Sequence, residues 1–273
     1  MYRVLKSHSA VERIAAAVEF IRSFPPATEL LIIGTSRDAV DDLVRELARS
    51  VKATFGLHRF SLTQLAARLA VGRLAGGGII PGTAIGAEAV AVRAAYEAQT
   101  HHELEYFAPV AKFPGFARAT AATIGELRAA GTTTKDLKRL DESGPDNAAL
   151  LERFEEEMKE VSVADRTILF RTALEEVRAG AELTKHPLLF LDIAVHSAIE
   201  KEFVATLAAA SQSVLITCLG GDLRTLQNLK GLSGAKQTGP APAPQGSSLA
   251  RLGFYLFSDA VPPEGKADDE VVF

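Results

Sequence analysis

Two short segments carry the residues with which this chain could do phosphate chemistry. The segment Gly34–Arg37 follows a short apolar run, and Asp192 closes another, Leu188–Leu191. A glycine, two hydroxyls and an arginine at a strand-to-helix turn suit an anion, because the amide groups of a helix N-terminus point toward it. An aspartate that ends a buried strand suits the Mg²⁺ ion that accompanies nucleotide phosphates. The candidate nucleotide site therefore consists of Gly34, Thr35, Ser36, Arg37 and Asp192.

Both halves of this candidate site lack groups that a nucleotide-hydrolysing enzyme needs. The turn after the first predicted strand, Lys6–Ala10, has no glycine and no lysine followed by serine or threonine, the residues that hold phosphates in a P-loop. Asp192 is followed by Ile193, where a second carboxylate would activate water. An ordinary capped turn at Gly34–Arg37 and a helix-capping role for Asp192 are the alternatives. We expect no catalytic residue in this chain.

A second set of side chains near predicted strand ends could contact a DNA backbone. Arginines and hydroxyls at the carboxyl edge of a parallel sheet can donate hydrogen bonds to phosphate oxygens. The candidate DNA contacts are Thr35, Ser36, Arg37, Arg59, Ser61 and Thr63. The net charge of −4 argues against DNA binding by bulk electrostatics and leaves only a local basic groove. Without tryptophan, and with 7% aromatic residues, the chain offers little stacking surface for single strands.

Alternating strand and helix signals must position these side chains. Apolar strand-like runs occur at Tyr2–Leu5, Leu30–Ile33, His58–Ser61, Pro187–Leu191 and Ser213–Leu219. Serine caps at Ser9 and Ser61 begin two of the intervening helices. The first helix carries an apolar stripe, which we expect to be buried, of Val11, Ile14, Val18 and Ile21. This alternation predicts an α/β fold with a parallel sheet flanked by helices.

A long helical segment interrupts the alternation. Between Gly86 and Gly180 the periodicity is helical, with no convincing strand. The main predicted helices are Ala87–Gln99, Phe116–Ala130, Ala148–Val161 and Asp165–Ala179. We therefore predict a sheet domain made of residues 1–85 and 186–273, interrupted by an all-helical insert subdomain at 86–185. Residues 234–248 are rich in proline and read as a linker without regular structure.

The remaining features exclude several classes of protein. The single cysteine, Cys218, rules out a disulfide framework and lies in an apolar run, as expected of a small core residue. No apolar run reaches membrane-spanning length and no signal peptide is evident, so we expect a cytoplasmic protein with no membrane partner. His101 and His102 are adjacent and point to different helix faces, which favours a polar helix end over a metal site. No metal ligand is predicted.

Several of these segments resemble a known family in order and spacing. The segments that carry the resemblance are Leu30–Thr35, Phe60–Leu65, Phe113–Arg118, Thr123–Arg128, Asp165–Leu169, Leu189–Asp192 and Gly221-Asp222. The pattern resembles the N-terminal helicase-like region of AddB/RexB-type subunits of bacterial helicase–nucleases, which share the superfamily 1 helicase architecture. Residues 270–273 look like the start of the next core strand, so we expect a fragment of a longer protein, truncated at its C-terminus.

The resemblance implies a fold, partners and a function. The split sheet domain would be a degenerate RecA-like core of the P-loop NTPase type, and the helical segment its inserted subdomain. The partners would be DNA and an AddA-like helicase subunit. This fragment would need no cofactor, whereas a PD-(D/E)XK exonuclease domain beyond Phe273 would use Mg²⁺ in the full-length protein. We therefore expect a non-catalytic scaffold for DNA double-strand-break repair. The alternatives are a divergent P-loop-like NTPase or small-molecule kinase, and an interaction domain without DNA contact.

Overall fold

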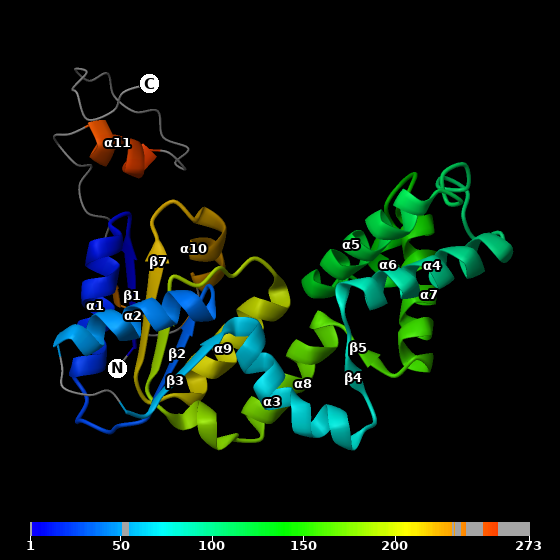
Figure 1. Cartoon of the computed structure of the whole chain (residues 1–273). Coiled ribbons are helices and arrows are strands. Elements are labelled where there is room, and N and C mark those ends of the chain that lie inside the picture. The colour runs from blue at the N-terminus through cyan, green and yellow to red at the C-terminus, as the bar shows by residue number, and fades with distance from the viewer. Residues whose placement is uncertain (1, 51–54, 231, 233–235, 239–247, 256–273) are drawn as a thin grey trace. The chain divides into compact units, whose positions relative to one another are not determined.

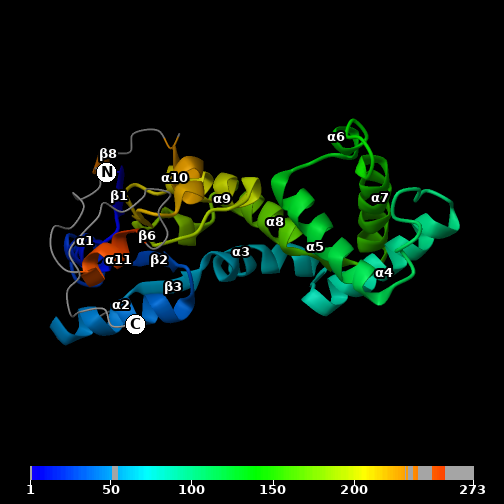
Figure 2. The same ribbon diagram turned by 90° about the horizontal axis from the view of Figure 1, so that it is seen from above.

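The computed structural model describes residues 2–50, 55–230, 232, 236–238 and 248–255. The chain divides into two compact units, whose elements are labelled in Figure 1 and Figure 2. The sheet unit contains residues 1–65, 180–196 and 207–273, and the helical unit contains residues 66–179 and 197–206. The predicted strand start at 270–273 lies outside the described residues.

A parallel sheet of five strands, in the order β3-β2-β6-β7-β1, forms the centre of the sheet unit. Its strands are β1 (Tyr2–Ser7), β2 (Leu30–Gly34), β3 (Leu57–Ser61), β6 (Leu188–Leu191) and β7 (Val214–Leu219). All five predicted strands and the parallel α/β fold are thus confirmed. The register places Gly34 opposite both Ser61 and Leu191, and Ser7 opposite Leu219. The carboxyl ends of the strands are therefore aligned along one edge.

A short additional strand, β8 (Lys236–Thr238), pairs in parallel with the outer side of β1. The prediction that residues 234–248 have no regular structure was therefore wrong for these three residues. The edge of β1 offers unpaired backbone groups, and pairing with them satisfies the backbone of even a short segment without strand-like composition. The last described element is helix α11 (Ser248–Tyr255).

Helices α1 (Ala10–Arg22) and α2 (Arg37–Ser50) pack against one face of this sheet. The shared core includes Ala17 and Ile21 of α1, Leu43 of α2, and Ile32 and Leu189 of the sheet. Residues on the other face, such as Phe190, are buried as well. A strand that is buried on both faces has a continuous apolar sequence, and such sequences made the strands of this sheet predictable.

The apolar stripe predicted for the first helix was wrong in its N-terminal part. Val11 is 78% exposed and Ile14 is 39% exposed, whereas Arg13, Ala17 and Ile21 are buried. The first turn of α1 lies next to the polar carboxyl edge of the sheet, where Arg13 finds hydrogen-bond acceptors. The helix is therefore turned so that a charged residue, and not Val11, faces inward.

The helical unit has its own apolar core. Its elements are α4 (Ala84–Thr100), α5 (Pro114–Ala130), α6 (Thr134–Leu137), α7 (Gly144–Glu160), α8 (Arg166–Arg178) and parts of α3 (Leu62–Gly76) and α9 (Ala198–Ala210). Phe154 and Ile124 are buried in a core shared by α4, α5 and α7. The short strands β4 (Ile80–Pro81) and β5 (Val163–Ala164) pair in parallel, so the prediction of no strand after Gly86 missed β5. Strand β5 has only two residues, which is too short for a strand to be recognised from the alternation of apolar and polar residues.

One buried carboxylate fastens the segment between α4 and α5. Asp146, in the first turn of α7, is 2% exposed. Its oxygens accept hydrogen bonds from the backbone N–H groups of Glu105, at 3.1 and 3.2 Å, and of Phe107, at 2.8 Å. The side chain of Phe107 packs against the core of the unit. Asp146 therefore satisfies backbone groups that a non-helical segment would otherwise leave unpaired.

The two remaining described elements are η1 (Glu182–Lys185), a 3-10 helix before β6, and α10 (Leu223–Leu229), after β7. Among the described residues, every helix is too short or too polar to cross a lipid bilayer.

Candidate functional site

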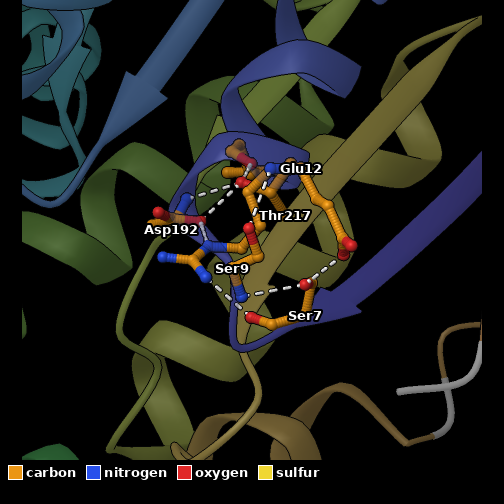
Figure 3. Close-up of polar contacts among 7 residues, drawn as sticks. Ser7, Ser9, Glu12, Asp192 and Thr217 are labelled. Atoms are coloured by element: carbon orange, nitrogen blue, oxygen red, sulfur yellow. Dashed lines mark hydrogen bonds and ion pairs between the residues drawn. The ribbon is translucent and has the colours of Figure 1, made fainter. Parts of the chain in front are cut away.

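The carboxyl ends of β1, β6 and β7 meet at one place on the sheet edge, drawn in Figure 3. From β1 the chain runs through α1 to β2, whereas from β7 it runs through α10 to β8, on the far side of β1. Neighbouring strands β1 and β7 thus send the chain in opposite directions. In open parallel sheets, ligands bind in the crevice at such a switch point. This edge is therefore the candidate functional site.

A buried ion pair occupies the centre of this edge. The Arg13 Nε atom lies 2.8 Å from Asp192 Oδ1, and Arg13 Nη1 donates to the carbonyl oxygen of Ser7 at 2.7 Å. The Arg13 side chain is 7% exposed and that of Asp192 is 29% exposed. One guanidinium thus joins the end of β1 to the end of β6. A positive charge so close to the carboxylate opposes the binding of a divalent cation.

Thr217 of β7 holds Asp192 from the other side (Figure 3). The Thr217 hydroxyl donates to Asp192 Oδ1 at 2.7 Å and accepts from the Asp192 N–H at 2.9 Å. Asp192 has a φ of 49°, in the left-handed region that aspartate tolerates better than most residues. Hydrogen bonds to both its backbone and its side chain keep it there. Asp192 is therefore a fixed structural acceptor at this site.

The turn between β1 and α1 is closed by its own side chains. Only His8 and Ser9 separate the end of β1 from the start of α1. The Ser9 hydroxyl caps α1 by accepting from the Glu12 N–H at 3.3 Å, which confirms the predicted cap. The Ser9 N–H donates to Ser7 Oγ at 3.0 Å, and Ser7 Oγ donates to Glu12 Oε2 at 2.5 Å (Figure 3). Side chains of the turn itself thus bind the Ser9 and Glu12 N–H groups at the helix start.

The imidazole of His8 fills the gap between the ends of β1 and β7. The Gly220 N–H donates to the Ser7 carbonyl oxygen at 3.1 Å. A Cβ atom on Gly220 would lie 2.5 Å from the His8 ring, so the ring rests directly on the glycine backbone. The switch-point crevice is therefore occupied at this position by a side chain of the protein itself.

His8 is expected to titrate below the ordinary histidine range. Burial lowers its pKa, and the neighbouring charges of Lys6 and Arg13 lower it further. Below pH 6.5 the unfolded chain then binds more protons at this position than the folded chain does. The free energy of unfolding therefore falls as the pH drops from about 6.5 toward the lowered pKa.

The measurement is an NMR titration of the His8 ring. We expect a midpoint below 6.5 that moves upward in the Lys6→Gln variant, because one repelling charge is removed. A midpoint at or above 6.5 in the unmodified protein would show that the ring is not packed as described.

The loop after Asp192 is also fixed by the sheet unit. The Val195 N–H donates to Thr225 Oγ1 at 2.8 Å, and Asn228 Nδ2 donates to the Val195 carbonyl oxygen at 2.8 Å. Asp222 caps α10 through the Thr225 N–H at 2.9 Å and lies 3.5 Å from His196 Nε2. These contacts come from the segment that follows β7, so β6 and β7 are joined beyond their ends as well as along them.

The segment Gly34–Arg37 lies at the end of β2. The neighbouring strand is β6, which ends next to Asp192. A Cβ atom on Gly34 would lie 2.6 Å from Val40 Cγ2, so this glycine allows α2 to pack against the sheet. Ser36 caps α2 by accepting from the Ala39 N–H at 3.1 Å. Thr35 lies between them and is exposed. These contacts account for the residue types without a bound anion.

Two of the predicted DNA-contacting arginines converge on one aspartate. Arg59 Nη1 lies 2.9 Å from Asp41 Oδ1, and Arg37 Nε lies 3.9 Å from Asp41 Oδ2. The Arg37 side chain is 53% exposed and that of Arg59 is 38% exposed. Both guanidinium groups therefore keep surface available to solvent although Asp41 compensates part of their charge.

The predicted hydroxyls of the neighbouring strand lie at the start of α3. Ser61 and Gln64 form the predicted cap: the Gln64 N–H donates to Ser61 Oγ at 3.3 Å, and the Ser61 N–H donates to Gln64 Oε1 at 3.0 Å. Thr63 lies in the same turn. The register of β3, β2 and β6 sets Ser61, Gly34 and Leu191 side by side, so the candidate residues share one sheet edge.

Sequence reasoning missed Arg13, His8 and Thr217, which with Asp192 make up the centre of the site. The signal for Arg13 was weak, because the same helix also carries the charged residues Glu12, Glu19 and Arg22. Cys218 is buried as predicted, and burial raises the pKa of its thiol to about 12, so it is no nucleophile.

No protein-family model matches this chain, and no curated protein matches it. The chemistry of the sheet edge is therefore the basis on which a function can be assigned.

Proposed function

We propose that this chain is a non-catalytic, helicase-like scaffold region of a cytoplasmic DNA double-strand-break repair subunit of the AddB/RexB type. In this proposal the sheet unit is a degenerate RecA-like core, and the helical segment is its insert. The parallel sheet, the helical segment and the sequence resemblance support the assignment. The observation that carries it is the ion pair between Arg13 and Asp192 at the carboxyl edge of the sheet.

The ion pair matters because of what a nucleotide requires. A phosphate-binding turn exposes backbone N–H groups to the ligand, and a strand-end carboxylate faces a Mg²⁺ ion. In this chain the turn has two residues, its helix start is capped by Ser9, and the His8 ring lies on Gly220. The carboxylate of Asp192 faces a guanidinium. The groups that would bind a nucleotide bind one another.

A sheet edge whose polar groups bind one another suits a scaffold that hydrolyses no nucleotide. Arg13 and Thr217 connect the ends of β1, β6 and β7 through Asp192. The same sheet edge can present Arg37 and Arg59 to DNA phosphates. The partner helicase subunit would supply ATP hydrolysis. Cleavage and its Mg²⁺ ion would belong to a nuclease domain outside this sequence.

DNA contact is tested by measuring the affinity of the chain for a forked DNA duplex at a series of salt concentrations. Fluorescence anisotropy of the labelled DNA reports binding at each concentration. Affinity should fall as salt rises, because phosphate contacts release counterions. Arg37→Ala and Arg59→Ala should each weaken binding and reduce the slope of log affinity against log salt by about 1. Arg49→Ala serves as the matched control, since Arg49 lies at the other end of α2 from Arg37 and pairs with Glu46.

The competing function is a divergent NTPase or small-molecule kinase, and calorimetry with ATP and Mg²⁺ separates it from a scaffold. We expect no measurable binding by the unmodified chain. Micromolar affinity that is weakened in both Arg37→Ala and Asp192→Asn would overturn the scaffold proposal. If neither ATP nor DNA binds, even at low salt, the DNA contact is refuted and an interaction domain remains.

A further inference from the structure

Two histidines and a glutamate meet at the opposite edge of the sheet, at the amino ends of three neighbouring strands. Glu29 precedes β2, His58 lies near the start of β3, and His186 precedes β6. The His58 Nε2 atom lies 2.9 Å from Glu29 Oε2, and His186 Nε2 lies 3.2 Å from the same oxygen. The two imidazole rings are stacked, with centroids 5.7 Å apart and an interplanar angle of 17°. Both rings thus direct a nitrogen toward one carboxylate.

The backbone holds the three residues in place. The Leu30 N–H donates to the Gly56 carbonyl oxygen, and the Leu31 N–H donates to that of Pro187, both at 2.9 Å. These bonds lie one and two residues after Glu29 and tie its segment to those of both histidines. Gly56 has a φ of 74°, and a Cβ atom on it would lie 3.2 Å from Glu29 Cα, so the close approach requires glycine. The three side chains therefore project from pre-positioned strand ends.

A further contact fixes the backbone of His186. The Ser211 hydroxyl lies 2.8 Å from the His186 carbonyl oxygen and 3.0 Å from that of Ser213, immediately before β7. Nearby, Glu182 holds the Lys185 ammonium at 2.7 Å, which compensates the positive charge next to His186. The Glu29 carboxylate thus favours a cation over an anion at the two imidazoles.

We propose that Glu29, His58 and His186 form a Zn²⁺ site in which water completes the coordination. Two imidazoles and one carboxylate are a ligand set that Zn²⁺ accepts with an open fourth position. Tetrahedral bonds of about 2.1 Å place ligand atoms about 3.4 Å apart. Here the possible ligand atoms of the three side chains all lie within 4.8 Å of one another, so small side-chain rotations suffice.

Access and location fit a site that strengthens the fold. The side chains are 24% exposed for His186, 36% for His58 and 52% for Glu29, so an ion can enter from solvent. A bound ion would cross-link β2, β3 and β6 at their amino ends, opposite the edge that carries Asp192. A bound ion would therefore stabilise the sheet unit, and this proposal stands independently of the proposed function.

The experiment uses the full chain without an affinity tag and Zn²⁺ alone as the probe. Calorimetry should show one ion per chain, and Co²⁺ should give the visible absorption of a low-coordinate site. His58→Ala, His186→Ala and Glu29→Gln should each weaken Zn²⁺ binding at least about tenfold, since even outer contacts of a metal site change affinity by that much. His101→Ala, in the helical unit, is the matched control and should bind like the unmodified chain.

A second readout separates a metal site from a hydrogen-bonded cluster. Excess Zn²⁺ should raise the Tm of the unmodified chain and of His101→Ala, and should leave the Tm of Glu29→Gln unchanged. Glu29→Gln preserves the shape of the side chain, so it decides the question if a histidine variant folds poorly. Absence of binding, or binding that all three substitutions leave intact, would overturn the proposal.

Discussion

Replacing Arg13 by alanine is expected to lower the free energy of unfolding of the sheet unit by about 2–4 kcal/mol. The substitution leaves the Asp192 carboxylate without its cation and removes one of the two donors to the Ser7 carbonyl oxygen, which keeps the Gly220 N–H. Removing one partner from a fully buried ion pair costs about 3–5 kcal/mol, and the 29% exposure of Asp192 reduces that cost. Denaturant unfolding followed by circular dichroism measures the change.

A double-mutant cycle tests whether Asp192 is the cause. Asp192→Asn keeps an oxygen for Thr217 and tolerates the left-handed backbone, but it removes the charge. We expect Arg13→Ala to cost at least about 1 kcal/mol less in that background. Arg49→Ala, a 77% exposed arginine on α2, should change stability by less than about 0.5 kcal/mol. Additive effects of the Arg13 and Asp192 substitutions would contradict the structural role given to the pair.

The second large effect is expected in the helical unit. Asp146→Ala should destabilise that unit by about 2–4 kcal/mol, because the backbone N–H groups of Glu105 and Phe107 lose their acceptor. Hydrogen exchange should become faster in the segment between α4 and α5, where these amides lie. Denaturant unfolding gives the change in stability, and exchange followed by mass spectrometry gives its location.

Asp146→Asn provides the matched control for this effect. Its side-chain oxygen can occupy the position of Oδ2, which accepts from both amides in the structure. We therefore expect most of the stability and protection to be retained. An asparagine variant as unstable as the alanine variant would mean that the charge, and not hydrogen bonding to the segment, is what matters.

The strands of the sheet were predictable because burial on both faces leaves a continuous apolar run. Leu30–Ile33 and Leu188–Leu191 have this property, and the structure begins and ends these strands within one residue of the predictions. β8 was not predictable, since its pairing depends on the free edge of β1 and not on its own composition. The orientation of α1 was mistaken because hydrophobic periodicity assumes an apolar surface beneath the whole helix.

The candidate sites depended on contacts that sequence spacing does not reveal. Asp192 was recognisable as a strand-end carboxylate, but its partner Arg13 lies 179 residues away in the chain. The trio of Glu29, His58 and His186 has no local motif, because it forms only when β2 lies between β3 and β6. The sequence drew attention to the adjacent His101 and His102, for which a polar helix end was favoured over a metal site, whereas the strand order brings together distant histidines.

The two-residue turn between β1 and α1 limits what a single substitution can achieve. Here a phosphate-binding turn would need inserted residues between Ser7 and Ala10, and Arg13 would have to be replaced as well. Either change alone breaks existing hydrogen bonds without creating a binding site. No single substitution therefore converts this turn into a phosphate-binding turn.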